Sequence, residues 1–362
     1  MARTSHSRTR LPRSTTLAPP VVPTGLLFLS SQMIEFSNPR SQTPLRLDGE
    51  HFVNPGDGMR VGTIRGGIPR FVAPDDNYAE SFGYQWKRWH SIRSDVRNPG
   101  HNLRKVILER THFGDFDLSG KTILECGMGG GDDTEVLLTL PFGEIHAFDL
   151  STSVERAAHF LADKRLRIFQ GSIYEIPYAD QSFDIVYCHR VLQHTPDPAE
   201  ALRRICAKVR PGGLLFAHSY KRSPAHMAEW RYKYRWLTKR LPWRAVVAYV
   251  DVAGPWLHRL NQLLYRYGWT RELAYRLIPF YRLPECGEGG GTSETAIIEL
   301  EKQITFDALT PWHDHPMRSE EFREVIESAG FDILHFFDPM VSPLFATARR
   351  RAATPASASG DK

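Results

Sequence analysis

Short apolar runs alternate with amphipathic stretches across residues 121–220, and this is the clearest pattern in the chain. Each apolar run is long enough for a buried strand, and each amphipathic stretch is long enough for a helix. The expected strands are 122–126, 143–150, a run that ends before Gly171, 182–189 and a run that follows Gly213. Strands that alternate with helices predict an α/β fold with a largely parallel sheet.

One helix of this region has a clear N-terminal signature. Asp197 stands at the capping position, Pro198 at the first helical position and Glu200 at the third. The pattern predicts a helix over 198–209, whose inward side chains are Leu202, Ile205 and Val209.

After the fifth expected strand, the chain inserts about 95 residues before the core pattern returns at 319–327, where Gly330 is expected to stop a helix. Two runs, 331–337 and 342–348, are expected to complete the sheet as a terminal pair of strands. The predicted organisation is a disordered tail at 1–46, a small β element and entry helix at 47–95, the α/β core at 96–220, a helical insertion at 221–318, the end of the core at 319–348 and a disordered tail at 349–362.

The insertion is rich in aromatic residues: 221–285 contain five of the eight Trp and seven of the thirteen Tyr. Helical spacing predicts two apolar stripes, one formed by Met227, Trp230, Tyr234, Leu237 and Leu241, the other by Trp256, Leu257, Leu260, Leu263, Leu264 and Tyr267. A cap over the active site is favoured, with contact to an anionic membrane surface as an added role. A nucleic-acid groove ranks last.

Charge narrows the choice of partners. The 362 residues carry a net charge of +5, but residues 1–34 and 349–362 hold +7 of it, so the body carries −2. Within the body, 221–285 have 13 Lys and Arg against 4 Asp and Glu. The net charge therefore says little about the substrate, and no nucleic acid is expected, because the acidic rest of the body would oppose a long phosphate track. The expectation of a small-molecule, sugar or lipid-linked acceptor comes instead from the family resemblance described below.

Four cysteines are spaced too widely for a metal clip, so a reduced, cytoplasmic protein without a metal is expected. No stretch of 18 apolar residues occurs.

The candidate cofactor site lies where the first core strand meets a glycine-rich turn. Gly127 and Gly129 allow a sharp turn and close approach of a ligand to the backbone. The second strand ends at Asp149, 22 positions beyond Gly127, where a carboxylate can bind ribose hydroxyls. Asp132 occupies the place of the third glycine of a dinucleotide fingerprint, and its charge would repel a pyrophosphate.

These residues resemble the class I S-adenosylmethionine-dependent methyltransferases, whose first motif, E/D-x-G-x-G-x-G, is matched by Glu125, Gly127, Gly129 and Gly131. Three further motifs follow in order, at 171–178, 182–189 and 209–216. The resemblance implies a Rossmann-like sheet that binds S-adenosylmethionine. Glu125 would hold the amino-acid end of the cofactor, the glycines would leave room for the rest of it, and Asp149 with Leu150 would bind the ribose. Gly171, Ser172 and Ile173 would flank the adenine, and His189 would lie at the rim.

Two more segments resemble a subgroup from surface-glycan and secondary-metabolite pathways. They are G-I-P-R-F at 67–71 with Y-A-x-S-F-G-x-Q-W at 78–86, and the segment 305–316. The resemblance suggests that Tyr78, Gln85 and Trp86 cover the cofactor, whereas helical spacing alone suits packing in a core. Some relatives carry a zinc ribbon near this point, but this chain has no cysteine before Cys126.

Three histidines follow core strands and are candidate general bases: His194 first, then His189 and His218. Each also fits a structural role. The hypothesis is O-methylation of a hydroxyl on a sugar, glycolipid or small secondary metabolite. C- or N-methylation of a quinone-like or other small molecule, and a non-catalytic cofactor-binding protein, stay open as alternatives.

Overall fold

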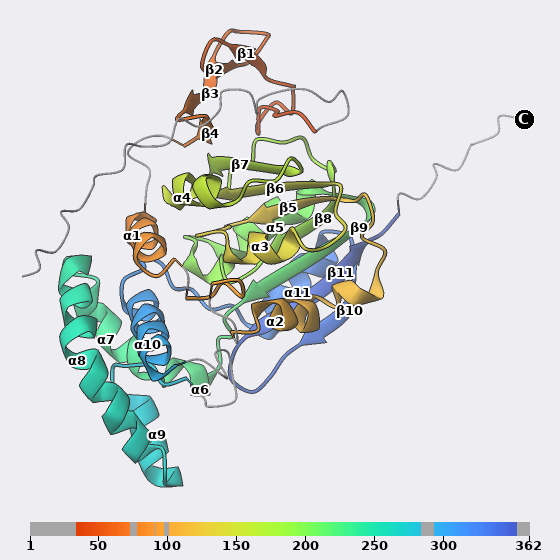
Figure 1. The fold of residues 1–362 in the computed structure, drawn as a ribbon. Helices are drawn as coiled ribbons and strands as arrows, with labels where there is room; N and C mark the ends of the chain where they lie inside the picture. Colours follow the sequence, from red (N-terminus) through yellow and green to blue (C-terminus); the bar gives the residue numbers. More distant parts are fainter. Residues whose placement is uncertain (1–33, 73–77, 91, 98–100, 284–292, 353–362) are drawn as a thin grey trace, which may run out of the picture.

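A single mixed sheet of eleven strands organises the molecule (Figure 1). The computed structural model describes residues 34–72, 78–90, 92–97, 101–283 and 293–352. In sheet order the strands are β1 (Arg46–Asp48), β2 (His51–Val53), β3 (Arg60–Arg65), β4 (Ile68–Phe71), β7 (Leu166–Gly171), β6 (Glu144–Asp149), β5 (Thr122–Cys126), β8 (Phe183–Cys188), β9 (Val209–Ser219), β11 (Leu344–Arg350) and β10 (Phe331–Phe337).

The centre of the sheet is parallel from β4 to β9, and only the outer strands run antiparallel. The five expected core strands and the terminal pair all form, so the α/β prediction is confirmed. β6 and β7 lie on one side of β5, whereas β8 and β9 lie on the other side, so the strand order reverses at β5. Ligands of open α/β sheets bind at the carboxyl ends of the strands at such a point.

Helices cover both faces of the core sheet, and further helices form a separate lobe (Figure 1). The core helices are α2 (Leu103–Thr111), α3 (Asp132–Leu137) and α4 (Ser153–Phe160) on one face, and α5 (Pro198–Lys208) and α11 (Ser319–Ser328) on the other. The short 3-10 turns are η1 (Phe113–Asp115) and η2 (Leu192–His194). The entry helix α1 (Glu80–Arg88) and the lobe helices α6 (Pro224–Met227), α7 (Trp230–Thr238), α8 (Trp243–Leu264), α9 (Gly268–Leu277) and α10 (Glu294–Leu309) complete the described chain.

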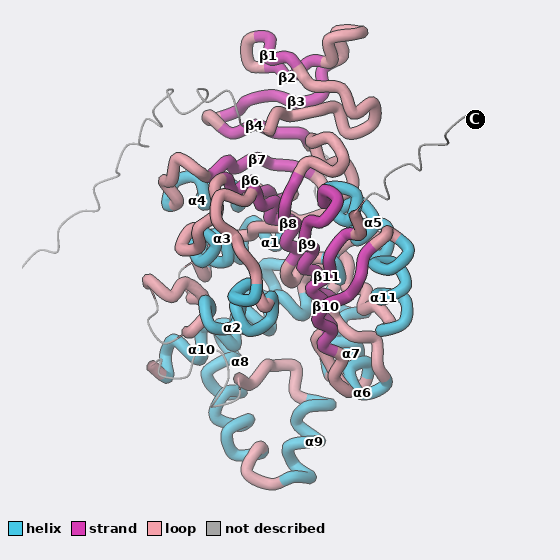
Figure 2. Tube along the Cα trace, turned by 90° about the vertical axis from the view of Figure 1, so that its right-hand side faces the viewer, coloured by secondary structure: helices cyan, strands magenta, loops and turns pink. Residues whose placement is uncertain are grey.

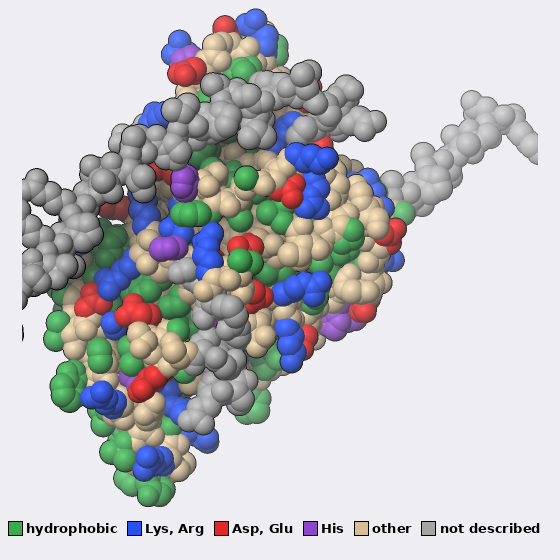
Figure 3. Space-filling view, viewed as in Figure 1, with side chains coloured by type: hydrophobic (Ala, Val, Ile, Leu, Met, Phe, Trp, Pro, Cys, Tyr) green, Lys and Arg blue, Asp and Glu red, His purple; other side chains and the backbone are tan. Residues whose placement is uncertain are grey.

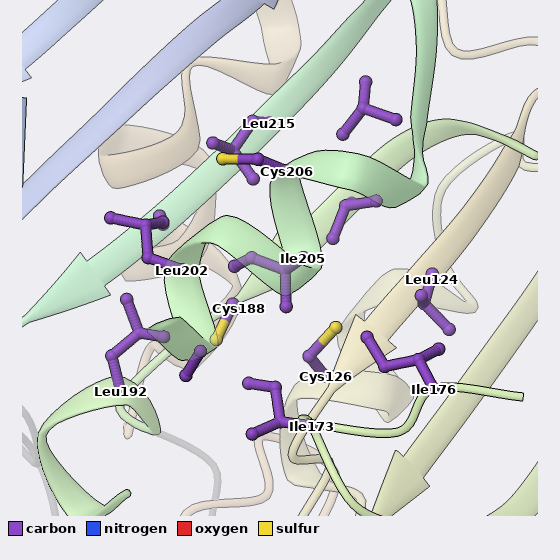
Figure 4. Close-up of a cluster of buried hydrophobic side chains, with 14 of the residues drawn as sticks. Leu124, Cys126, Ile173, Ile176, Cys188, Leu192, Leu202, Ile205, Cys206 and Leu215 are labelled. Atoms are coloured by element: carbon purple, nitrogen blue, oxygen red, sulfur yellow. The ribbon is translucent and has the colours of Figure 1, made fainter. Parts of the chain in front are cut away.

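The larger core cluster fills the space between the sheet and α5 and α11. Leu202 and Ile205 of α5 are fully buried, as the helical pattern predicts, in the same cluster as Leu124 and Leu215 of the sheet (Figure 4). Cys126, Cys188 and Cys206 are free and buried in the same cluster. Burial in apolar surroundings raises the pKa of each of these thiols, so they behave as small hydrophobic groups.

The N-terminal strands extend the core sheet instead of forming a separate module, because β4 pairs in parallel with β7 (Figure 2). The expected disordered tail is wrong for residues 34–46. Phe36 packs on the rings of Phe52, Phe71 and Tyr178, with centroids 4.8 to 5.3 Å apart, and Ser37 forms a β-bridge with Pro44. Apolar contact with the sheet orders this segment. Residues 1–33 lie outside the described part of the chain.

The C-terminal tail also begins later than expected. Residues 349 and 350 belong to β11, where the Arg350 guanidinium donates to the carbonyl oxygens of Cys206, Ala207 and Val209. Cys206 and Ala207 belong to the last turn of α5 and Val209 follows it, so Arg350 satisfies acceptors that the end of the helix leaves open. Residues 353–362 are not described.

The insertion is helical, but its apolar stripes do not coincide with its buried face. On α7 only Trp230 of the first stripe is deeply buried, whereas Leu237 is exposed and the guanidinium groups of Arg231 and Arg235 lie inside. Arg235 donates to the carbonyl oxygens of Ala308 and Pro311, so backbone acceptors replace the apolar contacts that helical spacing suggested. The second stripe, on α8, is also mostly exposed. Among the described helices, none has the length and apolar character needed to span a bilayer.

The N-cap of α5 allows a test of how much the predicted capping hydrogen bond contributes to stability. The Asp197 carboxylate accepts a hydrogen bond from the Glu200 backbone N–H at 3.0 Å. Asp197→Ala should lower the free energy of unfolding by about 1 kcal/mol. Asp197→Asn keeps an oxygen acceptor and should retain most of that stability. Urea denaturation followed by circular dichroism compares both variants with the wild type, and equal stability of the alanine variant would refute the contribution of the cap.

Candidate active site

A pocket of about 450 Å³ lies at the carboxyl ends of β5, β6, β8 and β9. Its walls combine these strand ends with α1 and with residues of the helical lobe, among them Tyr275 and Asp307. The pocket therefore spans the sheet and the insertion. Its volume is within the range of small-molecule sites.

The glycine turn after β5 forms one wall of the pocket, and it leaves no room for side chains at Gly127 and Gly129. Gly127 and Gly129 have φ angles of 80° and 54°, which side-chain-bearing residues rarely adopt. A Cβ on Gly127 would lie 2.3 Å from Val191, and one on Gly129 would lie 2.7 Å from the Trp86 indole. Trp86 of α1 thus packs directly on the turn.

Asp149 lies at the end of β6 and braces this turn. Its Oδ2 accepts a hydrogen bond from the Gly129 N–H at 2.9 Å, and its Oδ1 accepts from the Ser151 N–H and hydroxyl at 2.8 and 2.6 Å. Burial raises the pKa of this carboxyl, and these hydrogen bonds oppose the shift. The side chain lines the pocket, so it both shapes the turn and faces a ligand.

Most of the residues expected at the cofactor site line the same pocket: Tyr78, Gln85, Trp86, Gly127, Gly129, Asp149, Leu150, Gly171, Ile173 and His189. Glu125, Gly131 and Ser172 do not line it. Gly131 instead precedes α3 with a φ of 90°, and the Ser172 hydroxyl accepts a hydrogen bond from the Tyr174 N–H at 3.3 Å.

Glu125 lies beneath the turn. Its carboxyl is 2% exposed and accepts a hydrogen bond from the Thr134 hydroxyl at 2.7 Å. Burial, reinforced by the nearby Asp133 carboxylate, raises its pKa to about 8. Glu125 is therefore neutral near neutral pH, and a direct contact with a ligand needs a rearrangement of the turn.

Asp132 and Asp133, at the start of α3, supply carboxyl groups that line the pocket. Burial raises the pKa of Asp132 to about 7, and its Oδ2 has no hydrogen-bond partner among the described residues. An acidic lining with an unpaired acceptor suits a ligand that carries positive charge or hydroxyl donors, and it disfavours a pyrophosphate. The residues present therefore fit a sulfonium nucleoside.

The three candidate bases all line the pocket, but they differ in what their ring nitrogens contact. Nδ1 of His189 lies 2.7 Å from Oδ2 of Asp133, and its Nε2 lies 3.0 Å from Nη1 of Arg110. Burial lowers the pKa of His189 to about 4, so the ring is neutral, with Nδ1 donating and Nε2 accepting. Both nitrogens are occupied, which disfavours His189 as the base.

Asp133 completes this cluster. Tyr187 donates a hydrogen bond to the same Oδ2 at 2.6 Å. Although burial opposes ionisation, the hydrogen bond from His189, the nearby Arg190 guanidinium and the hydrogen bond from Tyr187 lower the pKa of the Asp133 carboxyl. His218 is also disfavoured as the base, because burial lowers its pKa well below the usual value.

His194 has the arrangement that a general base requires. Its Nδ1 lies 3.3 Å from the carbonyl oxygen of His313, which accepts a hydrogen bond when Nδ1 carries the proton. In that tautomer Nε2 is free to accept a proton, and it lies 4.0 Å from the Asp307 carboxylate. Asp307 in turn accepts a hydrogen bond from the Gln85 amide at 3.1 Å. Asp307 therefore lies next to both Gln85, which was expected to cover the cofactor, and His194, the first candidate base.

Several lining residues were not predicted. Asp307 and Tyr220 surround His194, while Tyr275, Tyr281 and Arg231 come from the lobe. Arg231 is 4% exposed and is paired with Glu229 at 2.8 Å, and Tyr281 donates to Glu229 at 2.5 Å. The aromatic excess of 221–285 was the signal for the lobe residues, and the segment 305–316 was the signal for Asp307.

One group of potential metal ligands in the described chain lies outside the pocket lining. Asp115 Oδ2 is 3.5 Å from Nδ1 of His112 and 3.7 Å from Nε2 of His335. The two imidazole rings are stacked, with centroids 3.7 Å apart and planes 5° apart. A metal lies in the plane of each ring that binds it, and two stacked planes share no such position, so the cluster suits a charge and stacking contact better.

Comparison with known proteins finds a family match in the centre of the chain. Residues 124–217 match the family model described as "Methyltransferase domain". The matched residues include the parallel strands β6, β7 and β8 and most of β5 and β9. Together with the strand order of the sheet, the match supports a Rossmann-like fold of the kind found in class I S-adenosylmethionine-dependent methyltransferases.

The methyltransferase domain is also similar to curated enzymes. The ubiquinone biosynthesis O-methyltransferase of Xanthomonas euvesicatoria is 31% identical over 156 residues, which cover 41% of this chain and 63% of that protein. The enzyme of the same name from Albidiferax ferrireducens is 32% identical over 143 residues, covering 38% and 55%. The chain thus spans less than two thirds of these relatives.

Solved structures include a similar S-adenosylmethionine-dependent methyltransferase from Mesorhizobium loti. The two chains are 16% identical, and the aligned region covers 65% of this chain and 93% of the other, with a TM-score of 0.40.

The raised pKa of Glu125 predicts a pH-dependent stability. Between pH 4.5 and 8 the unfolded chain releases the proton of Glu125 while the folded chain retains it, so folding stability falls as pH rises through this window. Glu125→Gln keeps the acceptor for Thr134 and removes this titration. Its stability should rise relative to wild type between pH 5 and 8, by on the order of 2–4 kcal/mol. Urea denaturation at several pH values measures the difference, with Glu109→Gln on the exposed side of α2 as the control. Parallel curves for wild type and Glu125→Gln would rule out a buried, protonated Glu125.

Proposed function

We propose that the protein is an S-adenosylmethionine-dependent O-methyltransferase that acts on a hydroxyl of a small molecule. The observation that carries this proposal is the position of His194. Its Nε2 is left to accept a proton in the same pocket that the glycine turn lines. The match to a methyltransferase domain and the similarity to two O-methyltransferases support the reaction class.

The cofactor would be held by residues around the turn. Asp149 would accept hydrogen bonds from the ribose hydroxyls of the cofactor, and Gly127 and Gly129 would allow the backbone to come close to it. Ile173 would contact the adenine ring. Trp86 packs on the turn and would cover the ligand. When bound, S-adenosylmethionine supplies a methyl group activated by a sulfonium.

On the acceptor side, His194 would take the hydroxyl proton on Nε2. The backbone carbonyl of His313 fixes the tautomer, and the nearby carboxylate of Asp307 stabilises the imidazolium that forms. Gln85 donates to Asp307 and so holds the carboxylate in place. The lobe and α1 would exclude water from the reacting groups and align the acceptor hydroxyl.

The acceptor end of the pocket favours a planar or aromatic molecule. Tyr220, Tyr275 and Tyr281 line it, and Ile304 adds an apolar contact. Aromatic walls suit a phenolic ring through stacking, and they also suit the apolar face of a sugar. A phenol is favoured because the similar curated enzymes are named for ubiquinone biosynthesis. A hydroxyl on a sugar, glycolipid or other secondary metabolite is the second class to assay.

The ribose role of Asp149 can be separated from its bracing role. Asp149→Asn should weaken binding of S-adenosylhomocysteine by about 10–150-fold, because charge-assisted hydrogen bonds contribute roughly 1.5–3 kcal/mol. Ser151→Ala removes one brace and keeps the carboxylate, so its affinity should stay near that of wild type. Isothermal calorimetry measures both. A comparable loss in the two variants would show that bracing, and not contact with the cofactor, explains the effect.

His194→Ala should lower kcat by about 10²–10⁴-fold and leave the affinity for S-adenosylhomocysteine nearly unchanged. The loss should be smaller for an acceptor whose hydroxyl is more acidic. His159→Ala, an exposed histidine on α4, is the matched control.

The assay follows transfer of a labelled methyl group to phenolic and sugar acceptors, and nuclear magnetic resonance locates the new methyl group. Full activity of His194→Ala would remove the assigned base. A methyl group on carbon or nitrogen would overturn O-transfer in favour of the alternative chemistry, and cofactor binding without any transfer would favour a non-catalytic role.

A further inference from the structure

The helical lobe exposes an unusually large set of apolar side chains on α7, α8, α9 and the turns beside them. We call this set the lobe face. Its members are Trp236, Leu237, Leu241, Val252, Trp256, Leu260, Leu263, Tyr267, Trp269, Leu273 and Leu277, each at least 42% exposed. Figure 3 shows hydrophobic side chains along the outer edge of the lobe and at its tip. Contiguous exposed apolar surface of this extent marks an interaction site.

The pattern on α8 shows that this exposure follows the helix periodicity. One side of the helix is buried and includes Val246, Val250 and Gly254. The other side presents Val252 and Trp256, which are 76% and 71% exposed and lie four residues apart. The helix is therefore apolar on two sides, and the described part of the chain buries only one of them.

Basic residues surround the lobe face. Between Trp230 and Leu277, eight Lys and Arg residues are exposed, namely Lys233, Lys239, Arg240, Arg244, Arg259, Arg266, Arg271 and Arg276. The one exposed acid in the same span is Glu272, which pairs with Arg276 at 2.7 Å. The guanidinium groups of Arg240 and Arg259 lie 5.8 Å from the rings of Trp236 and Trp256.

We propose that the lobe face docks on an anionic lipid bilayer. Tryptophan and leucine would enter the boundary between headgroups and acyl chains, and the surrounding arginines would pair with lipid phosphates. Arginine beside exposed tryptophan suits this boundary, because the aliphatic stem stays with the ring while the charge reaches the headgroups.

A second copy of the chain fits this face less well. A twofold interface brings the same surface of both copies together, so the basic rims would oppose each other across it. An anionic surface instead neutralises the charge of the rim, and each basic residue near such a surface adds to the binding.

Helix α9 connects the lobe face with the pocket. Leu273 and Leu277 belong to the face, whereas Tyr275 between them lines the pocket. Docking would therefore bring the acceptor end of the pocket close to the lipid, where a lipophilic acceptor concentrates. This last step rests on the proposed function, but the docking itself does not.

The test is flotation of the full-length protein, without cofactor or acceptor, with vesicles of phosphatidylcholine alone or mixed with phosphatidylglycerol. The protein should float with the mixed vesicles, and binding should fall as salt is raised. Trp256→Ala with Trp269→Ala should lower the bound fraction at least tenfold, while Trp312→Ala, an exposed tryptophan outside α8 and α9, should not change it. Arg259→Glu with Arg266→Glu should abolish binding, whereas Arg203→Glu with Arg323→Glu, on α5 and α11, should retain it. Circular dichroism and S-adenosylhomocysteine binding check that each variant is folded.

Absence of flotation, or equal binding to both kinds of vesicle, overturns the proposal. So does undiminished binding by the tryptophan variant. Light scattering that shows a dimer of the wild type and a monomer of the tryptophan variant would assign the face to a second copy. Because no turnover is measured, loss of methyl transfer and loss of docking are distinguishable.

Discussion

The bond from the Gly129 N–H to the Asp149 carboxylate is the interaction on which the pocket depends. It fixes the turn after β5 against the end of β6, and the turn in this position leaves no space for side chains. Trp86 can then lie on Gly129, which sets the position of α1. The same helix carries Gln85 to Asp307 on α10, and Asp307 faces His194. The hydrogen bond between the Gly129 backbone and the Asp149 side chain is thus linked to the acceptor side of the pocket through α1.

The sequence predicted the parts of the molecule whose stabilising contacts are local or periodic. The cap at Asp197 and the inward positions of Leu202 and Ile205 follow from neighbours along one helix, and both are present in the structure. The glycines after β5 were recognisable because few other residues tolerate their φ angles. The same motif suggested a ligand contact for Glu125, yet the carboxyl lies below the turn and bonds to Thr134. A motif indicates which residues belong to a site, but not the direction of each side chain in the ligand-free fold.

The lobe could not be predicted to the same extent, because its interior combines an apolar cluster with buried charged pairs, and its contacts are distant in sequence. Arg231 lies 3.9 Å from Asp314, and His258 lies 2.6 Å from Glu301, across separations of 83 and 43 residues. The spacing of apolar residues placed Leu237 on a stripe that is exposed in the structure, and it gave no reason to bury Arg235. A buried guanidinium is stable only when it is paired, and pairs of this kind leave no regular pattern in the sequence. The tyrosines of the pocket were missed for the same reason.

The width of the sheet has a consequence for solubility. Open sheets seldom exceed about ten strands, and every open sheet ends in two strands with free backbone groups that can recruit another chain. Here one end is β1, only three residues long and flanked by the charges of Arg46 and Asp48, 3.7 Å apart. The other end is β10, whose register shifts between Ile333 and His335. A short, charged strand at one end and an irregular one at the other are poor templates for a further strand, so the sheet can end within one molecule instead of continuing into the next.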